Sequence, residues 1–280
     1  MMPGPLARRI GAVPLPVFIG ALAVFNFILP PPALLGPELK FELPLLTSVL
    51  YTVFISVTSF LVAYISLKSY LKSGSTILLL LGSAALAWGF AALIGTWGTN
   101  TSSGPNAAIT IVNTGALFAS VLHVASGTLT STTASPQNGA GLRKPLSIFA
   151  YCGVIFSTTV LTIASLEGLV PLFFAPGVGQ TPVRMAVLGS AAALFAVSSL
   201  LFARLYFSSK SPILYWYFLA LAMTSVGLLS VFFGRAPGDP ISWTGRAAQF
   251  LGGVYFLKAV LATFREGRTG GGARQQNPPG

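Results

Sequence analysis

Long apolar stretches separated by short polar or charged segments make up most of the chain. A transmembrane helix needs about 20 mostly apolar residues to cross the hydrocarbon core of a bilayer. Eight stretches meet this requirement, at roughly residues 10–29, 43–67, 75–97, 106–128, 145–166, 183–207, 212–233 and 242–264. Alternation of apolar and polar residues with a period of two is nowhere sustained, so a β-barrel is not indicated. The pattern predicts an all-α integral membrane protein with eight transmembrane helices.

The composition agrees with a membrane protein and argues against most classes of enzyme. Hydrophobic residues make up 54% of the 280 residues and charged residues only 8%, whereas soluble domains carry about a quarter charged residues. A single histidine, His123, and a single cysteine, Cys152, exclude a haem held by two histidines and a cysteine-cluster metal site. Five acidic residues are too few for a multi-carboxylate metal or phosphoryl-transfer site: Glu38, Glu42, Glu167, Asp239 and Glu266. We therefore expect a protein that is not an enzyme and has no metal site.

The basic residues divide unequally between the two sides of the membrane when alternate loops are assigned to opposite sides. One side receives Arg8, Arg9, Lys68, Lys72, Arg143, Lys144, Arg204, Lys210, Arg265, Arg268 and Arg274. The other side receives Lys40, Arg184, Arg235 and Arg246. Because cytoplasmic loops collect Lys and Arg, this division predicts a multi-pass cell-membrane protein with both termini in the cytoplasm. It also explains the net charge of +11 without a nucleic-acid partner.

The two ends of the chain need separate interpretation. Arg8 and Arg9 before an apolar run are typical of a signal peptide, but Pro14 and Pro16 lie in that run and no small-residue cleavage site follows. We expect an uncleaved first span, with a cleaved signal peptide as the alternative. Residues 1–266 would then form one polytopic membrane domain. Residues 267–280 are rich in Gly, Gln and Pro and are expected to form a disordered cytoplasmic tail.

The two halves of the chain are similar to each other without gaps. Each residue of a matched pair is separated from its partner by the same number of residues as Lys68 from Arg204. Polar residues at one turn match as well as apolar ones, in the pairs Lys68 and Arg204, Tyr70 and Tyr206, Ser73 and Ser209, Ser75 and Ser211. A duplication would give two parallel repeats of four spans each, related by an axis along the membrane normal. The alternative is a chance match between apolar segments.

Polar residues at helical spacing form one stripe on each of two predicted spans. The last span carries Trp243, Arg246, Gln249 and Gly253, and the fourth carries Asn106, Thr110, Asn113, Gly115 and Ser120. One interpretation is interhelical packing, in which amides and small residues hold spans together. The other is an outward-facing pocket between spans four and eight, with Arg246 as the anchor for an anionic or carbonyl-bearing ligand. The pocket would be lined by Asn106, Thr110, Asn113, Trp243, Arg246, Gln249 and Tyr255.

Two further polar residues lie within predicted spans. We expect His123 to form a hydrogen bond with a neighbouring span rather than to bind a metal, because no second ligand is visible. Lys258, in the last span, has the position of a lysine that forms a Schiff base with retinal. No span supplies a carboxylate counter-ion, however, so we expect Lys258 to reach the cytoplasmic interface instead.

The segments 106–123 and 240–259 resemble the multi-span N-terminal sensor regions of archaeal-type membrane histidine kinases. The similarity rests on a pattern in the last span, made by Trp243, Gly245, Arg246, Gln249, Gly252, Gly253 and Tyr255. The resemblance implies a membrane sensor module whose last span precedes cytoplasmic signalling domains. This chain departs from the pattern because no PAS, coiled-coil or kinase sequence follows Arg265. Output domains would then belong to another chain, or the module would serve as a subunit.

Three functions remain open. The first is a non-catalytic sensor or binding module for a lipid, a quinone or another small hydrophobic ligand. The second is a structural accessory subunit of a membrane complex, and the third is a small-solute transporter built on the repeat. The expected partners are membrane lipids and either a separate signalling or complex subunit or a second copy of the chain.

Overall fold

The computed structural model describes residues 5–28, 43–98, 104–131, 138–175, 179–234 and 238–273. The helices are α1 (Pro5–Ala12), α2 (Pro14–Ala23), α3 (Pro44–Tyr51), α4 (Thr58–Ser73), α5 (Thr76–Gly98), α6 (Gly104–Ser131), α7 (Ala140–Leu166), α8 (Pro182–Ser209), α9 (Pro212–Phe233) and α10 (Pro240–Ala273). A π-helical turn, η1 (Val24–Ile28), follows α2, and another, η4 (Thr52–Val57), joins α3 to α4. Two short strands, β1 (Phe174–Ala175) and β2 (Gly179–Gln180), form an antiparallel hairpin between α7 and α8.

Proline marks the start of several helices. Pro44, Pro182 and Pro212 occupy the first positions of α3, α8 and α9. Proline suits this position because its fixed φ is helical and the amide that it lacks would have no partner in the helix. The start of α8 is also capped by Thr181, whose hydroxyl accepts a hydrogen bond of 3.3 Å from the amide of Arg184.

Seven of the described helical segments are long and apolar enough to cross a membrane. They are Arg9–Ile28, Pro44–Ser73, Thr76–Gly98, Asn106–Thr130, Ala140–Leu166, Pro182–Ser209 and Pro212–Phe233. Each corresponds to one of the first seven predicted spans. The all-helical membrane architecture is thereby confirmed. The eighth predicted span, 242–264, lies within α10 and stays a prediction.

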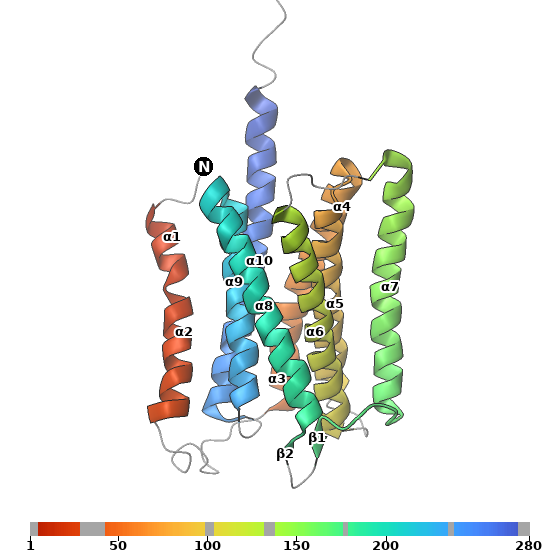
Figure 1. Ribbon diagram of the computed structural model, residues 1–280, viewed down its shortest axis with the longest axis vertical. Coiled ribbons are helices and arrows are strands. Elements are labelled where there is room, and N and C mark those ends of the chain that lie inside the picture. The colour runs from red at the N-terminus through yellow and green to blue at the C-terminus, as the bar shows by residue number, and fades with distance from the viewer. Residues whose placement is uncertain are drawn as a thin grey trace, which may run out of the picture.

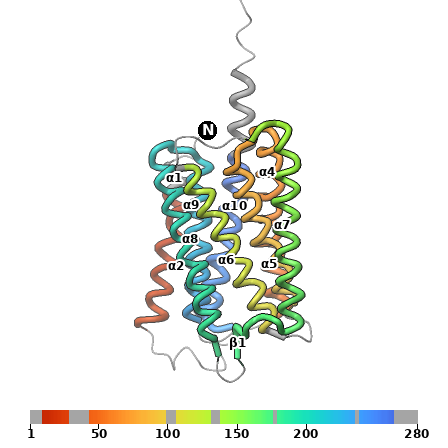
Figure 2. Tube along the Cα trace, turned by 45° about the vertical axis from the view of Figure 1, so that its right-hand side comes forward, coloured from red at the N-terminus to blue at the C-terminus, as the bar shows by residue number. Residues whose placement is uncertain are grey.

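The helices form a single bundle whose centre is shared by the two halves of the chain (Figure 1). α5 packs most extensively on α6 and α4, α9 packs on α10 and α8, and α6 packs against α8. Helices at opposite margins complete the bundle: the short helices α1 and α2 lie beside α9 and α10, and the long helix α7 lies beside α5 and α6 (Figures 1 and 2). Burial follows this arrangement. In the most apolar part of α9, 67% of the residues are buried inside the protein, whereas in the first span only 6% are buried.

The two ends of the bundle differ in charge. The ends of α4 and α8 and the start of α7, with Lys72, Arg204 and Arg143, lie at one end, which we call the basic end (Figure 1). The β1–β2 hairpin lies at the opposite end, which we call the hairpin end (Figure 1). Arg143 also caps α4, because its Nη1 donates a hydrogen bond of 2.6 Å to the carbonyl of Lys72. Lys72, Arg143 and Arg204, which the alternating-loop assignment puts on one side of the membrane, thus lie at one end of the bundle.

Glycines allow close approach between the best-packed helices. A Cβ atom added at Gly115 of α6 would collide with the Cβ of Ala91 on α5. A Cβ added at Gly245 of α10 would lie 2.7 Å from the carbonyl oxygen of Gly227 on α9. Without a strong hydrophobic driving force between helices in lipid, such small-residue contacts supply much of the packing.

The turns after α4 and α8 share one conformation. Gly74 (φ +75°) and Lys210 (φ +57°) are both left-handed, and each donates its amide hydrogen at 2.7 Å to the carbonyl of the tyrosine that begins the last turn of the helix. Gly74 adopts this conformation without steric cost, whereas Lys210 is the one described non-glycine residue with positive φ. In both turns a serine hydroxyl also accepts the amide two residues on, in the pairs Ser73 with Ser75 and Ser209 with Ser211.

The C-terminal helix is longer than the sequence predicts. The composition predicts disorder from Gly267 onward, but α10 continues to Ala273. Once a helix is anchored by packing, each added residue contributes one hydrogen bond without a new nucleation step. No proline interrupts the chain before Pro278. The remainder of the expected tail, 274–280, lies outside the described residues.

Candidate functional site

The polar stripe of α10 begins at the hairpin end. Asp239 caps the helix, because its carboxylate accepts a hydrogen bond of 2.6 Å from the amide of Ser242. In the first turns of α10 the Arg246 guanidinium lies over the Trp243 ring, 4.8 Å from its centroid. Its Nη1 donates a hydrogen bond of 3.3 Å to the Thr47 hydroxyl of α3. The cation is therefore held between an indole face and a hydroxyl.

One turn deeper, the stripe is buried against α3 and η4. Gln249 is 3% exposed and accepts a hydrogen bond of 3.2 Å from the Tyr51 hydroxyl. The next residue, Phe250, makes an edge-on ring contact with Tyr51 at 5.4 Å. A Cβ added at Gly253 would collide with the carbonyl of Phe54. The partner of this stripe is thus the second predicted span rather than the fourth.

The polar stripe of α6 has other partners. The side-chain carbonyl of Asn106 accepts hydrogen bonds of 2.9 and 3.0 Å from the amides of Phe173 and Phe174, which ties α6 to the hairpin. Thr110 is buried and donates to the carbonyl of Asn106 in its own helix. Asn113 is 4% exposed, and its Nδ2 has no hydrogen-bond partner. Asn106 thus has a structural role, whereas Asn113 retains unused hydrogen-bonding capacity.

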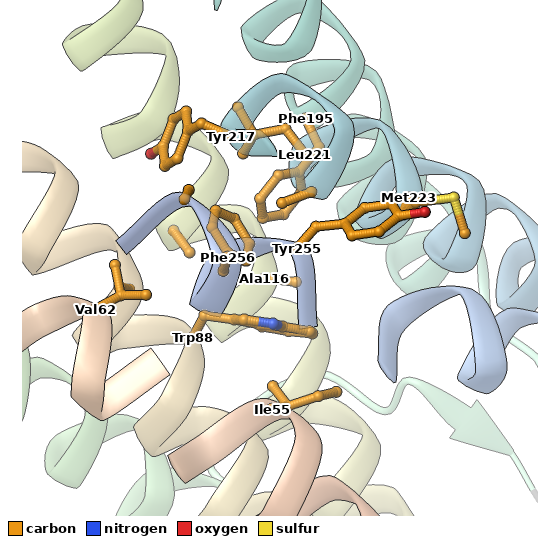
Figure 3. Close-up of a cluster of buried hydrophobic side chains, with 14 of the residues drawn as sticks. Ile55, Val62, Trp88, Ala116, Phe195, Tyr217, Leu221, Met223, Tyr255 and Phe256 are labelled. Atoms are coloured by element: carbon orange, nitrogen blue, oxygen red, sulfur yellow. The ribbon is translucent and has the colours of Figure 1, made fainter. Parts of the chain in front are cut away.

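The two stripes differ from the expected arrangement, in which they face each other. α6 and α10 do meet, but deeper in the bundle, where the rings of His123 and Phe256 stack with centroids 5.9 Å apart. Tyr217 of α9 lies beside them with its hydroxyl 2.7 Å from His123 Nδ1. The expected hydrogen bond from His123 to a neighbouring span is confirmed. Figure 3 shows Phe256, Tyr217, Phe195 and Trp88 in the apolar cluster on which helices from both halves of the chain converge.

Lys258 and Tyr255 lie closer to the basic end. The Tyr255 hydroxyl donates a hydrogen bond of 2.8 Å to the carbonyl of Gly11 in α1. The Lys258 side chain is exposed, and its ammonium lies 4.5 Å from the centroid of the Trp216 ring. A cation over an indole face explains this position, so nothing in it calls for a retinal Schiff base. No group of three or more potential metal ligands occurs among the described residues.

Sequence reasoning missed Arg184. The alternating-loop assignment treats it as a loop cation, but it lies in the first turn of α8, is only 8% exposed, and its Nε has no hydrogen-bond partner. The missed signal was helical spacing. Arg184 precedes the buried residues Leu188, Ala191 and Phe195 by one, two and three turns, so it belongs to the buried face of α8.

Comparison with known proteins identifies the kind of module. The family model of MASE3, described as a membrane-associated sensor domain, matches residues 40–264. The chain belongs to the MASE3 family. The resemblance to a multi-span membrane sensor region is thereby confirmed, as are membrane localisation and a sensory, signal-transducing role. No curated protein and no solved structure matches the chain.

The MASE3 match includes both polar stripes and Arg184 but not α1 and α2. These two helices attach to the MASE3 segment near the basic end, where Gly11 lies against the Trp216 ring and accepts the hydrogen bond from Tyr255. α2 itself has no buried residue. α1 and α2 are thus an addition to the matched MASE3 segment, joined to it chiefly through α9 and α10.

Proposed function

We propose that this MASE3 protein is a non-catalytic sensor that binds a small hydrophobic ligand with a carbonyl or anionic group at Arg246. A lipid or a quinone has this chemistry. The observation that carries the proposal is the position of the Arg246 guanidinium, stacked on Trp243 and bonded to Thr47 at the hairpin end of α10.

Even partial burial of an arginine in a transmembrane helix is costly, although near a helix end the cost is below the roughly 2.5–3.5 kcal/mol that insertion scales give at the centre. The guanidinium presents its N–H groups as a planar fork, and its Nη1 bonds to the Thr47 hydroxyl. The Trp243 face holds the cation in place. A ligand carbonyl or carboxylate at this edge of α10 has the acceptor geometry that a guanidinium fork recognises.

Gln249 and Tyr51 extend the proposed site toward the core. Their hydrogen bond joins α10 to α3 one turn below Arg246. A ligand that displaced either group would change the contact between these helices. α10 continues from this contact to Ala273, so a shift at Arg246 is passed toward the basic end through one continuous helix. We propose that the receiver is a separate signalling or complex subunit, or a second copy of this chain.

We further propose that α10 is the eighth span and that both termini lie in the cytoplasm. The basic end would then face the cytoplasm and the hairpin end, with Arg246, would face outward. A duplication of four spans is supported by the matching turns at Gly74 and Lys210, which are separated by the same offset as Lys68 and Arg204. It is also supported by the packing of α5 on α4 and α6, which parallels that of α9 on α8 and α10.

Quenching of tryptophan fluorescence by decylubiquinone tests the proposed site, because a quinone at Arg246 lies beside Trp243. We expect saturable quenching of the purified protein and a loss of affinity of at least tenfold in Arg246→Gln. Arg246→Lys keeps the charge but loses the planar fork, so it should bind weakly too. Trp243→Phe should remove most of the saturable signal.

Thermal unfolding of the same variants separates binding from packing. If Arg246 binds ligand, Arg246→Gln should lose affinity while its Tm without ligand stays within a few degrees of the parent protein. Quenching that is unchanged in Arg246→Gln, or a loss of fold equal to the loss of binding, would assign Arg246 to helix packing and refute the proposed site.

A further inference from the structure

We propose that Arg184, together with Asn113 and Gln180, forms a second binding site, for a small carboxylate, at the hairpin end of the α6–α8 interface. This site is made by other helices than the site at Arg246. It therefore stands or falls independently of the proposed function.

Unused polar atoms concentrate at this place. In the described ranges, five buried side-chain nitrogen or oxygen atoms have no hydrogen-bond partner: Ser56 Oγ, Ser83 Oγ, Asn113 Nδ2, Gln180 Oε1 and Arg184 Nε. The two serines lie in η4 and α5. Of the other three, Gln180 lies in β2, Arg184 lies in the first turn of α8, and Asn113 lies in the half of α6 nearer the hairpin end. Buried polar atoms without partners are rare in proteins, so three near one helix end require an explanation.

The register between α6 and α8 places Arg184 and Asn113 at similar depth. The two helices run in the same direction from the hairpin end, with His123 against Phe195 and Gly127 against Phe202. The number of residues between His123 and Phe195 is nearly the same as that between Gly127 and Phe202. The two contacts therefore agree on which positions of α6 and α8 lie side by side. The same register places Arg184 level with positions 109–112, within one turn of Asn113.

Both side chains lie on the faces that make this interface. Arg184 precedes Phe195 by about three turns and Phe202 by about five, which puts all three side chains on one face of α8. Asn113 precedes Gly127, which faces α8, by about four turns. Gln180 lies shortly before α8, and its other side-chain atom, Nε2, donates to the carbonyl of Gly234 at 2.7 Å. Because a carbonyl accepts only from a donor, the atom bonded to Gly234 is the amide nitrogen of Gln180, and the other side-chain atom is the oxygen, Oε1.

The electrostatics of the place favour an anion. A cation in the first turn of a helix is opposed by the positive end of the helix dipole, whereas an anion is stabilised there. Neither α6 nor α8 contains an aspartate or glutamate. Of the described acidic side chains, Glu167 is exposed after α7, and Asp239 caps α10 through its bond to Ser242. A bound anion would provide the charge that Arg184 lacks on its own and neighbouring helix.

The three unused atoms also define the chemistry of the ligand. Arg184 Nε and Asn113 Nδ2 are donors, which a carboxylate accepts, whereas Gln180 Oε1 is an acceptor. An acceptor beside the anion needs a donor on the ligand. A carboxylate with a hydroxyl or an amine on the adjacent carbon supplies both functions, so we assign the site to 2-hydroxy or 2-amino carboxylates.

Thermal shift and calorimetric titration of the purified full chain test this assignment with defined probes. Lactate should raise the Tm and bind with measurable heat, whereas methyl lactate, which has no charge, should do neither. Propionate, which lacks the hydroxyl, should bind several-fold more weakly than lactate. 2-Hydroxydecanoate distinguishes the source: tighter binding than lactate indicates a lipid-derived ligand, and equal binding indicates a free solute.

Variants locate the binding. Arg184→Gln should weaken lactate binding at least tenfold and Asn113→Leu several-fold, whereas Arg204→Gln, at an exposed position near the other end of α8, should bind lactate like the parent protein. Arg184→Met should leave the Tm without ligand unchanged or higher, because it removes a buried cation that no described carboxylate neutralises. Lactate binding that persists in both Arg184→Gln and Asn113→Leu, or no binding of any carboxylate to the parent protein, overturns the proposal. So does a large fall in the Tm of ligand-free Arg184→Met, because Arg184 would then have a structural partner.

Discussion

Replacing Gly245 with alanine is expected to destabilise the bundle, although alanine is the better helix former. An alanine Cβ at this position would lie 2.7 Å from the Gly227 carbonyl oxygen and 2.9 Å from the Ser230 Cβ, both on α9. One neighbour is backbone and the other is the stem of a side chain, so neither moves aside by a rotamer change. The helices must separate, at a cost near the upper end of the usual range of about 1–3 kcal/mol for overpacking. Subtracting a propensity gain of about 1 kcal/mol leaves a net loss of about 2 kcal/mol in the free energy of unfolding.

Gly153→Ala provides the matched control. Gly153 lies inside α7 at a margin of the bundle, and a Cβ added there would meet nothing within 4 Å. The same chemical change should therefore raise the free energy of unfolding, by up to about 1 kcal/mol. Reversible unfolding in mixed detergent–SDS micelles, followed by circular dichroism, measures both variants. Equal stability of Gly245→Ala and the parent protein, or an equal loss in both variants, would refute the argument from helix contact.

Two further predictions concern the core and the topology. Tyr217→Phe removes the hydroxyl that lies 2.7 Å from His123 Nδ1, which should lower the free energy of unfolding by about 1–3 kcal/mol because a buried nitrogen loses its partner. Tyr64→Phe, at a position 61% exposed, should change it by less than about 0.5 kcal/mol, and equal losses would contradict the prediction. In a background with the exposed Cys152 replaced by serine, cysteines at Ser135 and Ser102 should label from opposite sides of the membrane. Labelling of both from the same side would show the topology to be wrong.

The positions of the membrane helices are readable from the sequence because apolar length and helix boundaries are local properties. The stretch predicted at 75–97 is α5, Thr76–Gly98, and the stretch predicted at 212–233 coincides with α9. Pro212 marks the start of α9, and glycine marks the ends of both helices, at Gly98 and Gly234. The π-helical turns and the hairpin were not predicted, because each depends on how the chain packs against its neighbours.

The candidate sites were less accessible to sequence reasoning. Helical spacing predicts that Arg246 and Gln249 share one face of α10 and that Asn106 and Asn113 share one face of α6. Spacing does not say which helix a face will meet. The structure places the first stripe against α3 and η4 and ties Asn106 of the second to the hairpin. Arg184 was missed for a related reason: a cation at the edge of an apolar run looks solvated until a neighbouring helix covers it.

The length of α10 has a mechanical consequence. From Arg246 to Ala273 the helix measures about 40 Å at about 1.5 Å per residue. If it moves as a rigid lever pivoting at the Thr47 contact, a tilt of about 5° displaces its far end by about 3.5 Å, from the same helix geometry. A change at the hairpin end is thereby enlarged to the size of a side-chain contact at the other end, while the part of α10 that packs in the core moves less.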